Sequence, residues 1–232
     1  MRIQLTLETE AGQSPLDFEY QRMVNAGYVG RNRTEVQAHI DELAAKGIPG
    51  PKKVPTLFPV VGRMLITDEE IEVLSQETCG EVEYVLLVKD EETIYVGLGS
   101  DHTDRKLEEW DIPRSKQICP NVVSRAVWPL QEVADHWDRL VMRCRQRADG
   151  EEVLYQESEL AAILAPQELM EFVASETTAP LAGTVIFSGT TAALTGGFVY
   201  GEWLSAELED PILSRRLALA YDVRPLDYMK HD

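Results

Sequence analysis

The sequence has 232 residues, of which 44% are hydrophobic and 27% are charged. This composition fits one compact domain, or one domain with a small lobe, and it excludes intrinsic disorder and collagen-like repeats. The 40 acidic residues outnumber the 22 basic ones and give a net charge of −18, so we expect the surface to repel nucleic acid and anionic lipid. No stretch approaches the ~18 apolar residues of a membrane-spanning helix. We therefore expect a soluble, cytoplasmic protein without a membrane or nucleic-acid partner.

Apolar and polar residues alternate in the first thirty residues, at Ile3, Leu5 and Leu7 and again at Phe18 and Tyr20. This period of two predicts two strands joined around residues 11–15. Apolar residues then recur at helical spacing from residue 34 to residue 46, and the glycines and prolines that follow end this predicted helix. Residues 52–59 are expected to be a connector.

Two hairpins are predicted in the middle of the chain. Residues 80–88 and 93–101 are strand-like and flank a polar turn. Residues 138–148 and 151–157 also alternate and are joined by an Asp-Gly dipeptide, which is typical of a tight hairpin turn.

The remaining segments add one helical region and three strands. Residues 158–175 read as a helix in two pieces broken at a proline, and residues 184–188, 202–209 and 215–222 read as strands. The predicted class is therefore α+β and rich in β.

We expect two structural units. Residues 1–60 are predicted to form a small N-terminal subdomain that packs on a core domain, residues 61–232. One continuous domain is the alternative.

Three acidic residues gather on the first of these hairpins. Glu81 and Glu83 lie on one face of their strand, because alternate residues of a strand point the same way. If the turn is a three-residue loop, residues 90–92, Asp101 pairs with Glu81 on that face, whereas a two-residue loop places it on the opposite face. Clustered carboxylates either bind a hard divalent cation such as Mg²⁺ or Ca²⁺, or face solvent. His102, beside Asp101, would either contact one of the metal ligands or lie on an exposed loop, and we expect the exposed loop.

This hairpin resembles a motif of the fumarylacetoacetate hydrolase family, E-x-E followed by D-x-T-x-R. The matching residues are Glu81, Glu83, Asp101, Thr103 and Arg105. Similar segments follow in the family's order, namely S-K-Q around Lys116, A-D-G-E at residues 148–151 and G-T-V-I-F-S-G-T-T at residues 183–191.

Upstream segments extend the resemblance. Residues 30–32, 39–42 and 55–59 look like the family's G-x-N, H-x-x-E and P-x-x-F segments. Thr191 stands where the family has proline, and Lys116 lacks the usual glycine before it. The chain thus resembles a divergent member of the family.

The resemblance implies a fold, an assembly and a metal. The fold is a mixed β-sandwich roll of the fumarylacetoacetase C-terminal-domain type, and the assembly is a homodimer. Glu81, Glu83 and Asp101 would hold one Mg²⁺ or Mn²⁺. The implied substrate is a small anionic 2-oxo acid or acylpyruvate, which would react through a metal-stabilised enolate. Lys116 would act as a second, catalytic positive group.

The resemblance also suggests roles for residues outside the acidic triad. His39 and Glu42 share a face of the predicted helix and would activate a water molecule, although a half-exposed histidine beside an unrelated glutamate is an equal alternative. Gly189 and Thr190 would bind the substrate carboxylate. Arg105 would bind the substrate or form a structural ion pair with the acidic residues.

Three classes of protein are consistent with these features. The first is a metal-dependent hydrolase or lyase that catalyses C–C hydrolysis, decarboxylation, dehydration or tautomerisation. The second is a non-catalytic protein that binds a metal or a carboxylate ligand on the same scaffold. The third is a structural acidic domain whose carboxylates face solvent.

Overall fold

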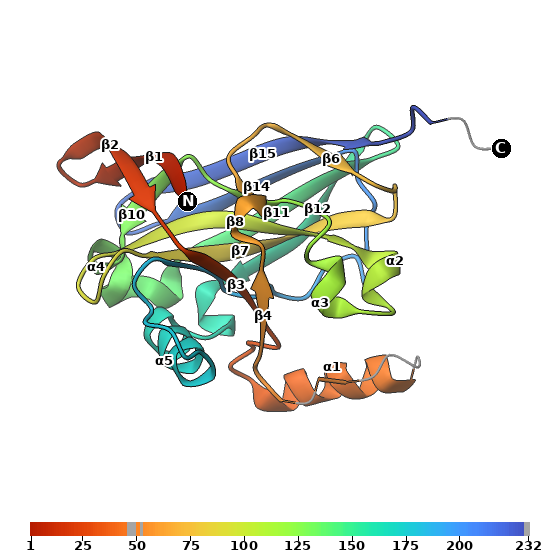
Figure 1. Cartoon of the computed structure of the whole chain (residues 1–232), viewed down its shortest axis with the longest axis horizontal. Coiled ribbons are helices and arrows are strands. Elements are labelled where there is room, and N and C mark those ends of the chain that lie inside the picture. The colour runs from red at the N-terminus through yellow and green to blue at the C-terminus, as the bar shows by residue number, and fades with distance from the viewer. Residues whose placement is uncertain (46–49, 52, 230–232) are drawn as a thin grey trace.

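The computed structural model describes residues 1–45, 50–51 and 53–229, without the side chains of residues 39 and 42–45. The described residues form two facing β-sheets with short helices at their edges (Figure 1). The class is α+β and rich in β, as predicted. No helix in this described part has the length and apolar character needed to cross a membrane.

The larger sheet has ten strands within the described residues. Its main path runs through β2 (Gly12–Glu19), β1 (Arg2–Thr9), β10 (Ala126–Pro129), β8 (Ile94–Asp104), β7 (Thr78–Val88), β13 (Thr184–Phe187), β3 (Arg22–Gly27) and β4 (Thr56–Val60). Two short strands extend it beside β8, namely β9 (Asn121–Val123) and β5 (Leu65–Ile66).

The smaller sheet has five strands within the described residues. Their order is β12 (Glu151–Glu159), β11 (Val141–Ala148), β14 (Trp203–Asp210), β15 (Arg215–Pro225) and β6 (Glu70–Val73). The α-helices are α1 (Arg33–Ala45), α2 (Arg105–Glu108), α3 (Ile112–Ser115), α4 (Leu130–Val133) and α5 (Pro166–Glu176).

Strands β7 and β8 lie at the centre of the molecule, and apolar residues cover both of their faces. Tyr84 and Leu86 of β7 belong to the core between the two sheets, together with Leu204 and Leu217 of the smaller sheet. Side chains of the alternate residues, such as Leu87, belong to a second core on the outer face of the larger sheet. Because both faces are covered, residues 84–88 of β7 and 94–98 of β8 are almost entirely apolar, and the polar and acidic residues gather at the other end of the two strands.

Both predicted hairpins are confirmed. β7 pairs with β8 and β11 pairs with β12, each antiparallel. Asp149 and Gly150 turn the second hairpin with positive φ angles of 53° and 76°, as a tight turn of this kind requires. Strand β7 begins two residues earlier than predicted and β8 continues three residues further, to Asp104.

Two predictions about local structure were wrong, and a third is confirmed in part. Residues 56–59 of the supposed connector belong to β4, because they pair with β3 in the sheet. The predicted two-piece helix begins at residues 158 and 159 as the end of β12; residues 160–162 then form a short 3₁₀ helix, and the second piece is α5, with proline in the first helical turn. His102 is not on an exposed loop: it is buried on β8, where it contacts Tyr221 of the smaller sheet.

The first sixty residues contribute strands to the larger sheet. β1 pairs with β10, and β3 pairs with β13, so strands from both sides of residue 60 share one hydrogen-bonded sheet. The division into residues 1–60 and 61–232 stays a prediction.

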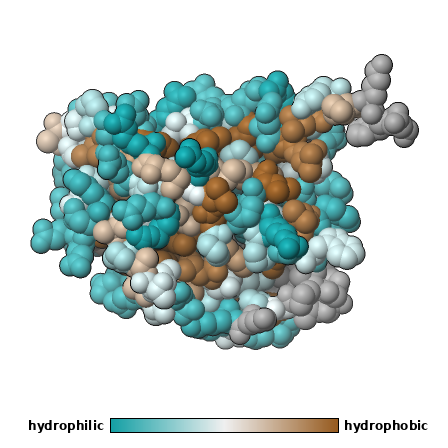
Figure 2. Space-filling view, in the orientation of Figure 1, coloured by the Kyte–Doolittle hydropathy of each residue, from teal (hydrophilic) through white to brown (hydrophobic). Residues whose placement is uncertain are grey.

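On the face shown in Figure 2, hydrophobic residues gather in the middle of the molecule between hydrophilic ones.

Candidate metal centre

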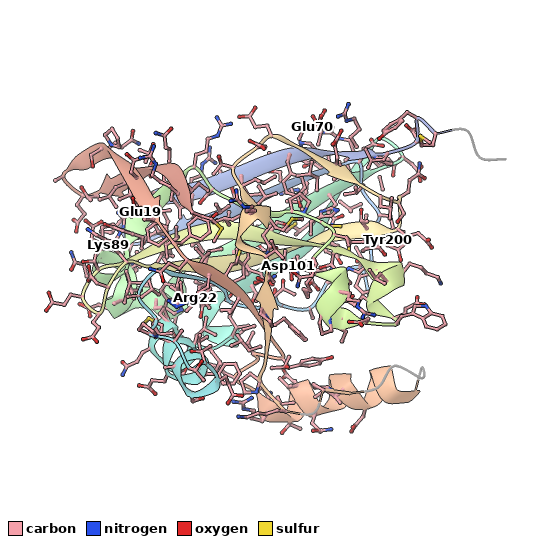
Figure 3. All side chains as sticks on the ribbon, in the orientation of Figure 1. Glu19, Arg22, Glu70, Lys89, Asp101 and Tyr200 are labelled. Carbon is pink, nitrogen blue, oxygen red and sulfur yellow. The ribbon has the colours of Figure 1, made fainter. Side chains whose placement is uncertain are left out.

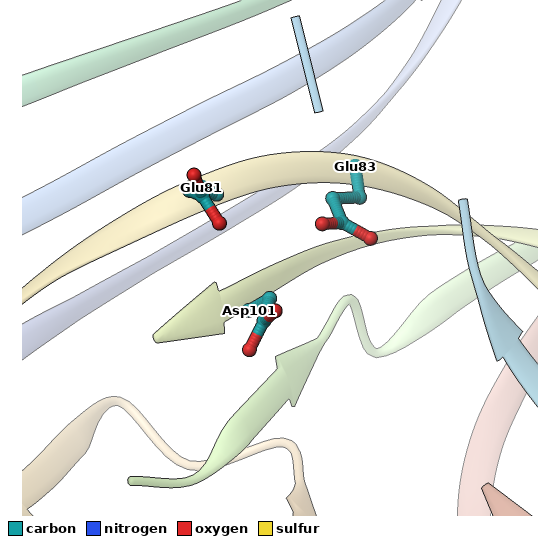
Figure 4. A group of neighbouring side chains, drawn as sticks. All are labelled: Glu81, Glu83 and Asp101. Carbon is teal, nitrogen blue, oxygen red and sulfur yellow. The ribbon is translucent and has the colours of Figure 1, made fainter. Parts of the chain in front are cut away.

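The β7–β8 hairpin brings three carboxylates together. Glu81 is paired directly with Asp101, which is the register that a three-residue loop produces. Glu83 lies two residues along on the same face of β7. One ligand atom from each of the three residues lies within 4.8 Å of the others. Figure 4 shows the carboxyl groups on neighbouring strands, and Figure 3 places Asp101 in the middle of the molecule.

Burial and mutual repulsion act most strongly on Glu83. The residue is 1% exposed, and its carboxylate accepts a hydrogen bond from the backbone N–H of Gly189 at 2.8 Å. Burial, together with the charges of Asp101 and Glu81, raises the pKa of Glu83 well above its usual value. Among the described residues, no cationic side chain forms an ion pair with it.

The negative charges of Glu81 and Asp101 are compensated by cationic side chains, whereas among the described residues that of Glu83 is not. Lys116, which directly follows α3, places its Nζ 2.6 Å from Oδ2 of Asp101 and 3.5 Å from Oε2 of Glu81. Arg105 at the start of α2 places a guanidinium nitrogen 3.2 Å from Oε1 of Glu81. Burial raises the pKa of Glu81, but these two cations outweigh it and hold the pKa below its usual value.

Lys116 is therefore part of the cluster rather than a surface lysine. Its side chain is 7% exposed and also donates to Oγ1 of Thr103 at 3.2 Å. Burial lowers the pKa of Lys116, but the charges of Asp101, Glu81 and Glu108 outweigh it, so the pKa is raised and the ammonium group keeps its proton. Its position is consistent with the catalytic role predicted for it, which stays a prediction.

The guanidinium group of Arg105 contacts other side chains of the protein. It is 3% exposed, donates from Nε to Sγ of Cys79 at 2.9 Å and forms an ion pair with Glu108 at 2.7 Å. The ring of Phe198 covers it, with the guanidinium carbon 4.4 Å from the ring centre. These contacts match the ion-pair alternative for Arg105, and its predicted contact with substrate stays a prediction.

Glu108 is a fourth acid of the site that the sequence analysis missed. It lies three residues after Arg105 on α2, and its Oε1 is 3.9 Å from Nζ of Lys116. The spacing to Arg105 was a signal for an ion pair on one helix face, but it gave no reason to place Glu108 beside the triad.

The loop after β13 closes the site from the side of Glu83. Gly189 has a positive φ of 83° and donates its N–H to Glu83. The Thr190 hydroxyl donates to the carbonyl of Val82 at 2.7 Å and accepts from Nε2 of Gln156, also at 2.7 Å. Gln156 is therefore a further residue of the site that the sequence analysis did not identify. The predicted role of Gly189 and Thr190 in binding a substrate carboxylate stays a prediction.

The predicted water-activating residues belong to α1. His39 and Glu42 occupy backbone positions within Arg33–Ala45, and their side chains lie outside the described part of the structure. Their role stays a prediction.

The donor set fits a hard divalent cation. Two buried carboxylates and one partly buried carboxylate converge, and oxygen ligands of this type are those that Mg²⁺ prefers. When ionised, the four carboxylates of the cluster outnumber its two cations, Lys116 and Arg105, so two negative charges remain uncompensated. A buried excess of charge is costly, and a dication at the triad would balance it.

Solved structures share this architecture. The protein Cg1458 matches with a TM-score of 0.62 at 15% identity, over 97% of this chain and 100% of that chain. The apo form of 2-keto-3-deoxy-D-arabinonate dehydratase matches with a TM-score of 0.64 at 14% identity, over 94% and 78%. The same dehydratase complexed with magnesium and 2,5-dioxopentanoate matches with a TM-score of 0.64 at 15% identity, over 94% and 78%. The chain therefore has the fumarylacetoacetate hydrolase fold, as the motifs predicted.

The sequence match identifies a family within this fold. Residues 26–221 match the family described as "Protein of unknown function (DUF2848)", and the chain belongs to this family. Among curated proteins, no relative matches the sequence.

Proposed function

We propose that this protein is a Mg²⁺-dependent enzyme that acts on a 2-oxo acid as a hydrolase or lyase. The observation that carries the proposal is the triad of partly buried Glu81 and buried Glu83 and Asp101, with ligand atoms within 4.8 Å of one another. The dehydratase of the same fold has been described with magnesium and 2,5-dioxopentanoate, which is itself a 2-oxo acid. This supports both the metal and the substrate class.

The chain's own residues suit this chemistry. A divalent cation at the triad would supply positive charge beside the ketone oxygen, where negative charge develops when a proton, carbon dioxide or an acyl group leaves the neighbouring carbon. Lys116 holds a second fixed positive charge within 3.5 Å of Glu81 and would attract the substrate carboxylate. Arg105 orients Glu81, and the N–H of Gly189 orients Glu83.

Four reactions share this requirement, namely C–C hydrolysis, decarboxylation, dehydration and tautomerisation. Hydrolysis additionally needs a group that activates water. We retain His39 and Glu42 of α1 as the candidates for that role. A non-catalytic protein that binds a metal or a carboxylate ligand on the same scaffold is the alternative, and turnover separates the two.

The test is calorimetric titration of metal-stripped protein with Mn²⁺, used as a probe for the Mg²⁺ site. Wild type is expected to bind one ion, and Glu81→Gln, Glu83→Gln and Asp101→Asn are each expected to weaken binding by about 100-fold or more. Glu109→Gln is the matched control, because this glutamate is 52% exposed, close in sequence to the site, and paired only with Lys106 among the described residues. It should bind Mn²⁺ like wild type.

Screening of 2-oxo acids with the loaded protein then separates the functions. Metal-dependent turnover in wild type, absent in the triad variants, would support the enzyme. Tight binding of a 2-oxo acid without turnover would favour the binding protein. Folded wild type that binds no Mn²⁺, alone or with a 2-oxo acid, would refute the proposal.

A further inference from the structure

Gln156 reaches the larger sheet from β12 of the smaller sheet. Along the β11–β12 ladder, one shift of register leaves Tyr155 without an opposite residue, which is a β-bulge. In a regular strand, successive side chains point to opposite faces. At this bulge the side chains of Tyr155 and Gln156 are both buried, each residue with 2% exposure. The bulge therefore turns a polar side chain inward, and this side chain bonds to β7.

The side-chain amide of Gln156 belongs to a closed ring of hydrogen bonds. Its Oε1 accepts from the N–H of Val82 at 3.1 Å, and its Nε2 donates to Oγ1 of Thr190 at 2.7 Å. The Thr190 hydroxyl donates in turn to the carbonyl of Val82 at 2.7 Å and closes the ring. Nε2 also donates to the carbonyl of Thr191 at 2.7 Å. Because that carbonyl can only accept and the N–H of Val82 can only donate, the amide has one possible orientation.

The ring lies where β13 no longer pairs with β7. The two strands pair over residues 85–88 of β7, and the N–H of Ser188 then donates to the carbonyl of Tyr84 at 3.1 Å. Two residues further along β7, the N–H and the carbonyl of Val82 each bond to a side chain, of Gln156 and of Thr190. Backbone groups inside a protein need such partners. The two side chains therefore take the place of a strand and attach the loop after β13 to β7.

This attachment lies on both sides of a hydrogen bond that reaches a metal ligand. Val82 lies between Glu81 and Glu83 in β7. Thr190 directly follows Gly189, whose N–H donates to Oε2 of Glu83 at 2.8 Å. The bond to Glu83 therefore depends on the distance between the loop and β7, which the ring sets. Hydrogen bonds of this kind orient a metal-binding carboxylate, and their loss weakens metal binding by about 10- to 100-fold.

We propose that Gln156 is a positioning residue of the metal centre. Its amide holds the loop after β13 at the distance from β7 at which the N–H of Gly189 orients Glu83 for the metal. The amide bonds to Val82, Thr190 and Thr191, so it acts on the metal through them. This inference rests on the proposed function, because it needs a metal ion at the triad.

The test is calorimetric titration of metal-stripped protein with Mn²⁺. Gln156→Leu removes the amide and keeps a side chain of similar size. Gln146→Leu is the matched control, because Gln146 is also 2% exposed and its Nε2 donates to the carbonyl of Gly80 in β7, at 3.3 Å. Among the described residues, it forms no hydrogen bond with residues 189–191. Both variants lose buried hydrogen bonds and should melt below wild type.

The Mn²⁺ affinities are compared once circular dichroism shows that the variants are folded. Gln156→Leu is expected to bind Mn²⁺ about tenfold more weakly than wild type, because the loop is no longer held against β7. Gln146→Leu should bind Mn²⁺ like wild type. A loss of stability that both variants share thus does not produce the expected difference.

Thr190→Val breaks the same ring from the loop. It removes the hydroxyl with little change of shape, and it tests the ring on its own if Gln156→Leu does not fold. It should also weaken Mn²⁺ binding about tenfold. The double variant should bind Mn²⁺ no more weakly than Gln156→Leu alone, because residues that act through one network are not additive.

The outcomes separate this inference from the proposed function. If wild type binds no Mn²⁺, alone or with a 2-oxo acid, the proposed function fails and this inference fails with it. If wild type binds Mn²⁺ and either folded ring variant binds it as tightly, the ring does not position Glu83 and the proposed function stands. Equal weakening in Gln146→Leu, or losses that add in the double variant, would also overturn the inference.

Discussion

At the scale of single residues, Glu83 differs from the other acids of the site. Glu81 and Asp101 each contact the ammonium group of Lys116, whereas Glu83 has a backbone N–H as its partner. Its pKa is raised well above the usual 4.5 by burial and by the neighbouring carboxylates. The metal-free protein therefore contains a group whose ionisation opposes folding.

This predicts a pH-dependent effect of Glu83→Gln. Because the raised pKa means that the folded state binds this proton more tightly than the unfolded chain, metal-free wild type loses stability as the pH rises from about 4.5 through the raised pKa. The variant lacks this loss and should be more stable at pH 7, by about 1.4 kcal/mol for each unit of difference in pKa. Urea unfolding in the presence of a chelator, from pH 5 to pH 8, measures the difference.

Added Mg²⁺ provides the complementary measurement. It should stabilise wild type, because it binds the folded state, and leave Glu83→Gln unchanged. A variant that is less stable than wild type at every pH without metal would contradict this account of Glu83.

At the scale of elements, the loop after β13 depends on one glycine. Gly189 has a φ of 83°, and a Cβ atom there would be 2.7 Å from Val29 and 2.9 Å from the backbone of Ala26. Gly196, in the same loop, has a similar φ of 69° but no atom within 4 Å of such a Cβ. Comparing substitutions at the two positions therefore separates the cost of backbone strain from the cost of overpacking.

We predict different effects of alanine at these two glycines. Gly189→Ala should destabilise the protein by about 2 kcal/mol or more, from strain together with overpacking. It should also weaken Mn²⁺ binding about tenfold, because the N–H that orients Glu83 is displaced. Gly196→Ala should cost only about 1 kcal/mol and leave Mn²⁺ affinity unchanged. Thermal unfolding and calorimetry measure both, and equal effects on Mn²⁺ binding would exclude this role for Gly189.

At the scale of the whole molecule, the two sheets pack tightly against each other at Gly80, next to Glu81. A Cβ atom on Gly80 would be 2.4 Å from Leu204 of β14 and 2.6 Å from the hydroxyl of Tyr221 of β15. The smaller sheet therefore packs directly behind the strand that carries two of the metal ligands.

Gly80→Ala should force the sheets apart. We expect a loss of about 2 to 3 kcal/mol, which lowers the melting temperature of a protein of this size by roughly 5 to 10 °C. Gly197→Ala is the control, because no atom lies within 4 Å of the place that the added methyl group would occupy. If both variants melt at the wild-type temperature, the packing of the sheets does not depend on Gly80.

Local sequence features were sufficient for the central part of the fold. The alternation in β7 and β8, together with the turn between them, predicted the hairpin and limited the position of Asp101 to one of two faces. The Asp149-Gly150 turn predicted the second hairpin, because only a few residue types adopt its positive φ angles. These features depend on residues that are close in the chain, so the local pattern alone predicted both hairpins and the gathering of three acidic residues on one of them. The metal and the fold were expected from the resemblance to the fumarylacetoacetate hydrolase family.

The tertiary structure decided what depends on residues far apart in the chain. The register that places Asp101 beside Glu81 was one of two open alternatives, and it is specified by the two apolar cores that cover the hairpin. The same packing placed β4 in the sheet and His102 in the core. Glu108 carries no local signal of a place at the site, because its position beside Lys116 depends on how α2 packs against the hairpin.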